Sequence, residues 1–281
     1  MVASAFFFAG MGVAVKAAAQ TLPNSMVVFF RSAGGLLFLL PWVARLGFRN
    51  LGTRHLPEHL VRSLAGLAAM YCFFYTIAHM PLADAVLLNY SLPLFLPFIG
   101  NLWLGEAIPA GLWPGLILGF LGIVLILKPG LDLFNPVALV GVAAAVLAAV
   151  AQTGIRRLTH TEPTTRIVLY FSVVSTVVSG IPLLHSWKRP DPAMWGVLVA
   201  LGLLATFGQL FLTKAYAQAP AAQVGPFIYT AVVFAAAFDA FIWGKWPDAL
   251  SMGGSILVCA AGILTLRRIA PPPSALAELV E

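Results

Sequence analysis

Ten long apolar runs dominate this sequence, and each is about as long as a helix that crosses a bilayer. Such a helix needs about 20 mostly apolar residues to cross about 30 Å of hydrocarbon. Only 9% of the 281 residues are charged, whereas about 25% are charged in a soluble domain, so most of the surface must face lipid. The approximate limits of the runs are 2–20, 24–44, 60–80, 82–104, 109–127, 136–155, 165–185, 193–216, 219–243 and 248–266. We expect an all-α integral membrane protein with ten transmembrane helices.

Turn-forming residues separate the runs and support this prediction. Pro129-Gly130 and Trp246-Pro247-Asp248 are two of the breaks, and such residues favour turns. The runs are continuous and do not alternate, which excludes a transmembrane β-barrel. The first run has no basic region before it, so we expect a first helix rather than a cleaved signal peptide. Residues 269–281 include three consecutive prolines and are expected to form a disordered cytoplasmic tail.

Lysine and arginine near the ends of the runs predict the orientation, because cytoplasmic ends carry an excess of these residues. With a cytoplasmic N-terminus, ten of them lie inside and five outside. The inside residues are Arg45, Arg49, Arg54, Arg62, Arg156, Arg157, Arg166, Lys214, Arg267 and Arg268, and the outside residues are Lys16, Lys128, Lys188, Arg189 and Lys245. We therefore expect both termini to be cytoplasmic.

Several classes of function lack the residues that they require. The basic residues are scattered among apolar runs, which argues against nucleic-acid binding. Cys72 and Cys259 lie within apolar runs and are expected to be free thiols. The sequence has no Gly-x-x-x-x-Gly-Lys-Ser/Thr motif for ATP. It also has no His-Glu-x-x-His motif and no paired carboxylates for catalysis. We predict no cofactor, no bound metal and no catalytic residues.

The two halves of the sequence show a weak internal repeat. A shift of 139 positions aligns several identical residues, and the ten runs then fall into two sets of five. The aligned pairs include Pro81 with Pro220, Tyr90 with Tyr229, Phe95 with Phe234 and Gly105 with Gly244. An odd number of spans per repeat inverts the second half, which is typical of transporters that open a central site to each side in turn. We predict a first repeat at 1–130 and an inverted second repeat at 131–268 around a central cavity.

Several short motifs are spread along the whole chain. They are Val13-Ala14-Val15-Lys16, Phe29-Phe30-Arg31-Ser32, the stretch 75–93, and Leu104-Gly105-Glu106 followed by Gly115, Ile117, Leu118 and Gly122. In their order and spacing these motifs resemble the drug/metabolite transporter superfamily, in its ten-helix EamA-type branch. The chain departs from this pattern at Gly244-Lys245, where the family usually has Gly-Glu, and at Val232, where it usually has proline. The chain most resembles bacterial inner-membrane exporters of amino acids and related metabolites, including YddG-type aromatic amino acid exporters. The resemblance implies a basket-like arrangement around a central cavity, and it implies export.

Ionisable residues inside the runs are candidates for substrate contact, because burying them in a membrane is costly unless they meet water, a partner or a ligand. Arg31 lies about two turns into the second run and Lys16 lies at a similar depth in the first. Either side chain can hold a substrate carboxylate, and either can instead extend to the interface. Asp239 either pairs with Lys16 or Lys245 or carries a coupling proton, and an ion pair is the favoured interpretation.

Neutral polar residues and prolines complete the predicted pathway. Tyr71, Tyr75 and His79 share one face of the third run. The other polar candidates are Asn89, Tyr90, Gln152, Gln209 and Tyr229. These groups either line a wet cavity or form hydrogen bonds between helices. Pro93, Pro97 and Pro226 interrupt the fourth and ninth runs, where we expect the helices to bend during gating.

The combined prediction is a secondary transporter that exports small metabolites across the bacterial inner membrane by alternating access. Amino acids are the expected substrates, and aromatic or other bulky ones are favoured because of the tyrosines and the arginine. The expected partners are this small molecule and the lipid bilayer, and the oligomeric state is left open. The alternatives are a membrane-embedded enzyme and a structural or sensory membrane protein.

Overall fold

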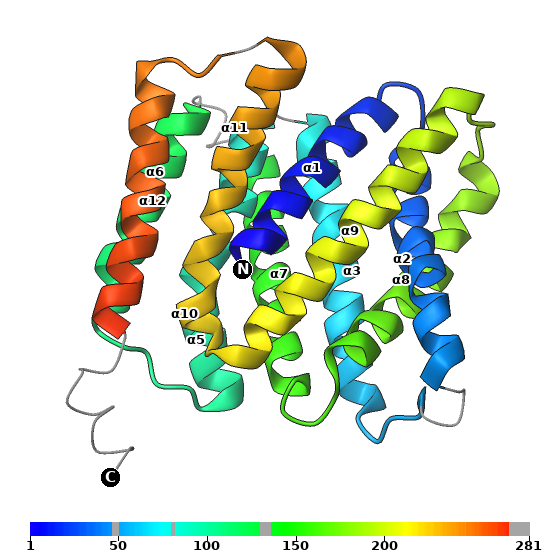
Figure 1. Ribbon diagram of the computed structural model, residues 1–281, viewed down its shortest axis with the longest axis horizontal. Coiled ribbons are helices and arrows are strands. Elements are labelled where there is room, and N and C mark those ends of the chain that lie inside the picture. The colour runs from blue at the N-terminus through cyan, green and yellow to red at the C-terminus, as the bar shows by residue number, and fades with distance from the viewer. Residues whose placement is uncertain (47–50, 80–81, 130–135, 245, 270–281) are drawn as a thin grey trace.

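The computed structural model describes residues 1–46, 51–79, 82–129, 136–244 and 246–269, and every regular element among them is a helix (Figure 1). The elements are α1 (Val2–Ala18), α2 (Asn24–Leu46), α3 (Leu56–His79), α4 (Leu82–Asn89), α5 (Leu92–Leu104), α6 (Leu112–Leu127), α7 (Val137–Leu158), α8 (Thr164–Ser186), α9 (Pro192–Gln218), α10 (Ala221–Val224), the 3-10 segment η3 (Gly225–Tyr229), α11 (Thr230–Trp243) and α12 (Ala249–Ile269). Lys245 and nearly all of the predicted tail lie outside the described residues.

Length and hydropathy identify six candidate membrane spans within the described ranges. They are Asn24–Arg45, Ala85–Leu104, Val137–Leu158, Thr164–Ser186, Pro192–Gln218 and Ala221–Trp243. Three further apolar helices are shorter, at Val2–Ala18, Leu112–Leu127 and Ala249–Thr265. The predicted all-helical architecture is confirmed over this part of the chain, whereas the count of ten spans stays a prediction.

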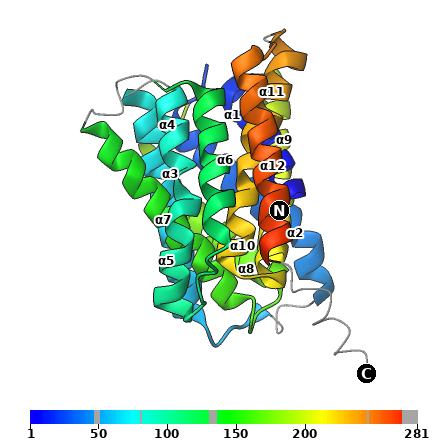
Figure 2. The ribbon, with the colours of Figure 1, turned by 90° about the vertical axis from the view of Figure 1, so that its left-hand side faces the viewer.

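The helices stand side by side and join segments that are far apart in the sequence. α6 packs along α12 at one edge of the molecule, and α2 packs along α8 at the other (Figure 1). The turned view in Figure 2 brings the edge with α6 and α12 to the front. Between the two edges, α3 packs on α7 and α1 crosses α9. Each of these pairs joins the first half of the chain to the second half.

Glycines allow the closest of these contacts. A Cβ atom on Gly34 of α2 would lie 2.6 Å from the Cα atom of Gly202 in α9, so the two backbones touch. Gly122 of α6 and Gly254 of α12 meet in the same way, with the carbonyl oxygen of Gly122 lying 2.5 Å from a Cβ atom on Gly254. Small residues let membrane helices approach and gain dispersion contacts. Gly115 of α6 likewise lies against α12, where a Cβ atom would overlap with Oγ1 of Thr265.

Two of the predicted spans are broken helices. The run at 82–104 divides into α4 and α5 around Tyr90 and Ser91, and Pro93 lies in the first turn of α5. The run at 219–243 divides into α10, η3 and α11, and Pro226 lies at the start of η3. Proline lacks a backbone N–H and cannot donate the bond that continues a helix. The breaks therefore lie at or beside prolines, whereas Pro97 is held within α5.

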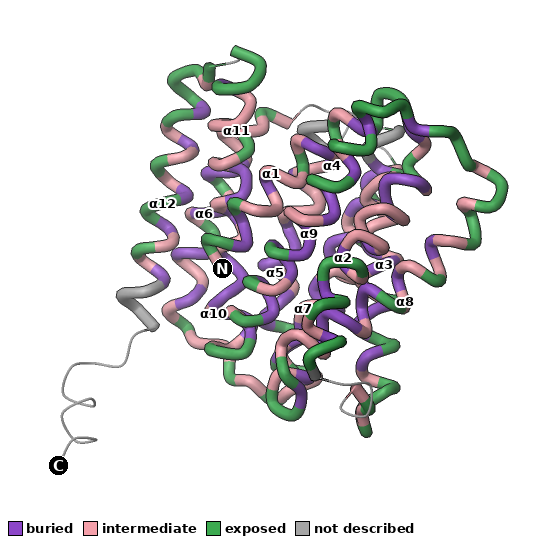
Figure 3. Tube along the Cα trace, turned by 45° about the vertical axis from the view of Figure 1, so that its right-hand side comes forward, coloured by how far each residue is buried: buried purple, intermediate pink, exposed green. Residues whose placement is uncertain are grey.

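The outward faces of the helices are apolar. Buried residues lie mainly between helices, and exposed residues lie mainly on outer faces and at helix ends (Figure 3). The exposed side chains include Leu102 at 89%, Leu184 at 81% and Phe241 at 78%. So much exposed hydrocarbon is unfavourable in water and favourable in lipid.

Candidate functional site

A small polar cavity lies between α2, α8 and α9. Its volume of about 10 Å³ is room for roughly one water molecule. The lining residues are Arg31, Ser32, Gly35, Val168, Phe171, Ser172, Ala205, Thr206 and Gln209. Arg31 and Gln209, which were predicted from separate runs, are thus brought together.

Arg31 and Gln209 keep donors that the surrounding protein does not fully use. Nε of Arg31 donates only to the sulfur of Met11, at 3.4 Å, and a thioether is a weak acceptor. Nε2 of Gln209 is buried without a hydrogen-bond partner. The hydroxyls of Ser32 and Thr206 instead donate to carbonyls of their own helices. The hydrogen-bond donors in the cavity that remain available to a ligand are therefore those of the Arg31 guanidinium and the Gln209 side-chain amide.

Arg62 of α3 lies beside this cavity and is almost completely buried, with 2% of the residue exposed. Its Cζ atom is 3.7 Å from the centroid of the Phe171 ring, and Cζ of Arg31 is 5.8 Å from the same centroid. Nε and Nη1 of Arg62 make no hydrogen bond. The positive charges of the two arginines lie close enough to repel each other.

The sequence prediction assigned Arg62 to the cytoplasmic ends of the spans and missed this position. The structure places the side chain between helices because small residues leave it room. A Cβ atom on Gly154 of α7 would lie 3.1 Å from Cβ of Arg62, and one on Gly66 would lie 3.8 Å from Nη1. Gly66 lies one helical turn after Arg62, and this spacing was the signal available in the sequence.

The remaining predicted site residues lie away from the cavity lining. Tyr75 stacks on His79 with ring centroids 4.1 Å apart, and Nδ1 of His79 lies 2.8 Å from the carbonyl oxygen of Tyr75. Gln152 of α7 accepts a hydrogen bond from the hydroxyl of Tyr216 in α9. Lys16 pairs with Asp239 at 3.1 Å at the end of α1, as the favoured interpretation of Asp239 predicted.

Three further candidates lie at the two broken helices. Asn89 ends α4 and Tyr90 follows it, while Tyr229 ends η3. The hydroxyl of Tyr229 is buried without a partner, as is that of Tyr71 in α3. The Tyr229 ring packs against the backbone at Gly119, where a Cβ atom would lie 2.6 Å from it. The break at η3 therefore holds one tyrosine hydroxyl, that of Tyr229, with unused bonding capacity.

Glu106 joins several helix ends into one cluster. Its carboxylate accepts from Nε of Arg156 at 2.9 Å and from the backbone N–H of Ala221 at 3.1 Å. Arg156 also donates to the carbonyl oxygen of Tyr216 at 3.0 Å. Glu106 thus connects the end of α5 to the end of α7 and the start of α10.

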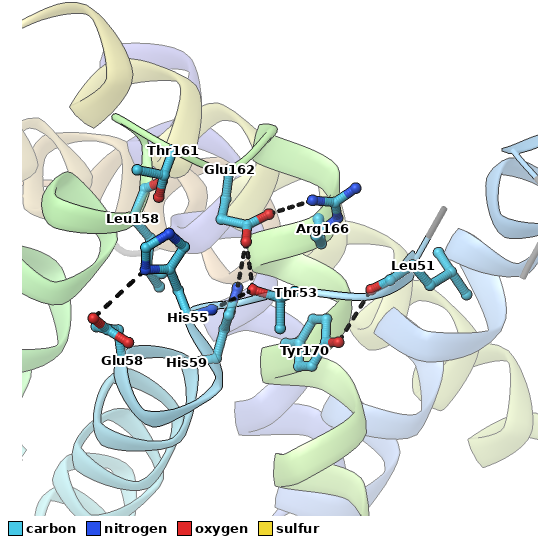
Figure 4. Close-up of polar contacts among 10 residues, drawn as sticks. All are labelled: Leu51, Thr53, His55, Glu58, His59, Leu158, Thr161, Glu162, Arg166 and Tyr170. Atoms are coloured by element: carbon cyan, nitrogen blue, oxygen red, sulfur yellow. Dashed lines mark hydrogen bonds and ion pairs between the residues drawn. The ribbon is translucent and has the colours of Figure 1, made fainter. Parts of the chain in front are cut away.

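Glu162, in the turn between α7 and α8, organises a second cluster (Figure 4). It accepts from the hydroxyl of Thr53 and from Nη1 of Arg166, the latter at 2.5 Å. Burial raises the pKa of this carboxyl, but the two hydrogen bonds and the charge of Arg166 outweigh burial and hold the pKa below its ordinary value. His59 lies 3.9 Å from Glu162 and stacks on Tyr170, with centroids 4.4 Å apart. Burial lowers the pKa of His59 to about 4.

The sequence and the fold both match known proteins. The EamA-like transporter family matches residues 1–128 and 135–267. Pseudopaline exporters from two strains of Pseudomonas aeruginosa are 38% identical over 269 residues, which are 95% of this chain and 94% of theirs. An S-adenosylmethionine uptake transporter of Rickettsia bellii is 28% identical over 240 residues, covering 85% and 82%. A riboflavin transporter of Vibrio cholerae is 27% identical over 249 residues, covering 87% and 83%.

A crystal structure of a protein with 18% sequence identity superposes with a TM-score of 0.81 over 93% of this chain and 94% of the other. At that identity the likeness shows the fold alone. The family match extends over nearly all of the sequence, and apolar helices long enough to span a bilayer accompany it. The chain is a multi-pass membrane protein that belongs to the EamA-like transporter family.

Proposed function

We propose that this protein is a secondary transporter that moves small metabolites out across the bacterial inner membrane by alternating access. The observation that carries the proposal is the cavity with Arg31 and Gln209, buried inside a member of the EamA-like transporter family. The names of the relatives support a small organic substrate, since they refer to pseudopaline, S-adenosylmethionine and riboflavin. These relatives include both exporters and uptake transporters. We take export as the direction because the pseudopaline exporters are 38% identical to this chain and because the sequence motifs resemble those of bacterial exporters.

Ten spans in two inverted repeats, 1–130 and 131–268, are part of this proposal. If α1, α2 and α3 correspond to α7, α8 and α9, the contact of α1 with α9 corresponds to that of α7 with α3. The contact of α2 with α9 then corresponds to that of α8 with α3. Gly105 and Gly244, which the shift of 139 aligns, both end helices with positive φ angles of 68° and 66°. This paired packing supports two halves of similar structure. The uneven distribution of lysine and arginine supports cytoplasmic termini.

Arg31 and Gln209 are the proposed contacts to a substrate carboxylate. A guanidinium matches a carboxylate through two parallel hydrogen bonds, and an amide adds a further donor. Phe171 supplies an aromatic surface in the same cavity. An amino acid or a related metabolite with a bulky apolar part fits this set of groups.

Opening of the cavity requires helix movement. Ligand pockets enclose about 300–1,000 Å³, far more than this cavity of about 10 Å³. We propose that the broken helices near Pro93, Pro97 and Pro226 bend as the halves separate. The cluster at Glu106 ties helix ends on one face, and the pair of Lys128 with Asp248 ties α6 to α12 at the other. If the contacts on one face break while those on the other face remain, the cavity would open to one side of the membrane only.

Transport by the purified protein in liposomes tests the proposal. Radiolabelled amino acids, dicarboxylates and nucleosides are offered to vesicles with wild-type protein, with Arg31→Gln or with Arg157→Gln as a control. Arg157 lies at the end of α7, where its side chain is 43% exposed. We expect uptake of at least one class, at least a tenfold loss in Arg31→Gln and no loss in Arg157→Gln. No uptake of any class above protein-free vesicles would contradict the proposal.

A further inference from the structure

Two arginines, the buried Arg62 and the partly buried Arg31, share one aromatic ring at the candidate site. Arg62 lies closest to Phe171, at 3.7 Å from the ring centroid, and Arg31 lies at 5.8 Å. They come from α3 and α2, and Phe171 comes from α8. Arginine stays protonated at any physiological pH, so two positive charges lie together inside the bundle.

The described acidic side chains do not balance these charges. Six acidic residues have described side chains, and each of these carboxylates is engaged elsewhere, in an ion pair or a helix cap. Glu58 pairs with His55 and Arg157, Glu106 with Arg156, Glu162 with Arg166, Asp239 with Lys16 and Asp248 with Lys128, while Asp191 accepts from the N–H of Met194. None of these six carboxylates pairs with Arg31 or Arg62.

The contact with Phe171 compensates only a small part of the cost. The attraction between a cation and an aromatic face is weaker than the penalty for removing an ion from water, even after relaxation. In addition, Nε and Nη1 of Arg62 have no hydrogen-bond acceptor, and two like charges repel. A membrane protein retains such an arrangement where a ligand supplies the missing negative charge.

We propose that the substrate carries two acidic groups, one bound by Arg31 with Gln209 and the other by Arg62, with an apolar part against Phe171. The inference rests on the proposed transport function and narrows the substrate class to dianions, above all dicarboxylates. A single carboxylate at Arg31 would leave Arg62 buried and unneutralised. A second acidic group removes that imbalance and gives Arg62 an acceptor for its free N–H groups.

Binding of two matched probes to the purified full chain tests this inference. N-succinyl-phenylalanine carries two carboxylates, and N-succinamoyl-phenylalanine replaces the succinyl carboxylate with an amide of the same size. We expect the wild-type protein to bind the diacid at least tenfold more tightly than the amide. Arg62→Gln should bring the two affinities to within about twofold and leave the affinity for the amide nearly unchanged. Arg31→Gln should weaken both.

The controls separate a ligand role from a packing role of Arg62. Arg62→Lys keeps the charge and should keep part of the preference for the diacid, whereas Arg157→Gln should keep all of it. If the Arg62→Gln variant does not fold, the affinities of the wild-type protein for the two probes still test the inference. Equal binding of the two probes, or binding of neither, would overturn the inference. Transport of a monoanionic or neutral metabolite in the liposome assay would at the same time leave the proposed transport function standing.

Discussion

Burial of a guanidinium without an anion is among the costliest arrangements that one residue can make in a membrane protein. The position of Arg31 within the helix bundle was predictable, because this residue lies about two turns inside an apolar run. Arg62 was not, because an arginine two residues into a run normally extends to the interface. Its burial depends on Phe171 and Gly154, which are far away in the sequence. Patterns along one helix do not report such contacts between helices.

The stability of the protein should depend on His59 below neutral pH. His59 lies just before the predicted third span, fully buried, and burial lowers its pKa from 6.5 to about 4. Glu162 and Glu58 favour its charged form, whereas Arg62 and Arg166 oppose it. Between these pH values the unfolded chain binds a proton there and the folded chain does not, so stability falls as the pH drops from about 6.5 to about 4.

This effect is measurable by thermal unfolding of the detergent-solubilised protein at pH 7 and pH 5. We expect the wild-type Tm to fall by about 4–8 °C more than that of His59→Gln, because a pKa lowered from 6.5 to about 4 removes roughly 2 kcal/mol between pH 7 and pH 5. The lowered pKa of Glu162 affects the stability only below the ordinary pKa value of 4.5. It therefore does not affect the comparison between pH 7 and pH 5. An equal fall in both proteins would show that His59 is not the group responsible.

At the scale of helices, apolar length and prolines predicted most of the elements. The runs at 24–44 and 165–185 became α2 and α8, with ends within two residues of those expected. Pro93 and Pro226 marked the places where the fourth and ninth runs break. The pairing of helices was not predictable, because it depends on which small residues face each other across an interface.

The contact between α2 and α9 should depend on Gly202. A Cβ atom there would lie 2.8 Å from Cα of Gly34, and two backbones cannot relax as a flexible side chain can. Gly202→Ala should therefore destabilise the protein by about 1–3 kcal/mol. Gly196→Ala in the same helix has nothing within 4 Å of its Cβ atom and is the matched control. Thermal unfolding that lowers the Tm equally in both variants would contradict the proposed backbone contact.

The break at η3 should contribute to the rate of transport. Pro226→Ala restores a backbone donor and allows α10 and α11 to form a straighter helix. We expect the maximum transport rate in liposomes to fall at least threefold while the Tm is unchanged or higher. Pro182→Ala, near the end of α8, is the control for loss of a proline inside a helix. An unchanged rate in Pro226→Ala would contradict a gating role for this break.

At the scale of the whole molecule, composition predicted a membrane protein, and the family match confirms a multi-pass transporter fold. The shift of 139 positions predicted two related halves, and helix pairs between the halves form the body of the structure. The candidate site lies between α2, which belongs to the first half of the chain, and α8 and α9, which belong to the second half. Its substrate could not be predicted from sequence, because the groups proposed to contact the substrate come from α2, α3, α8 and α9.

Counterflow in liposomes tests alternating access through the Arg31 site most directly. Vesicles are loaded with an excess of the unlabelled substrate found by the uptake assay, and entry of the labelled substrate is then followed. An alternating-access carrier returns loaded faster than empty, so we predict that loading accelerates entry in the wild-type protein but not in Arg31→Gln. Entry that is independent of internal substrate, or acceleration that persists in Arg31→Gln, would contradict transport by this mechanism at this site.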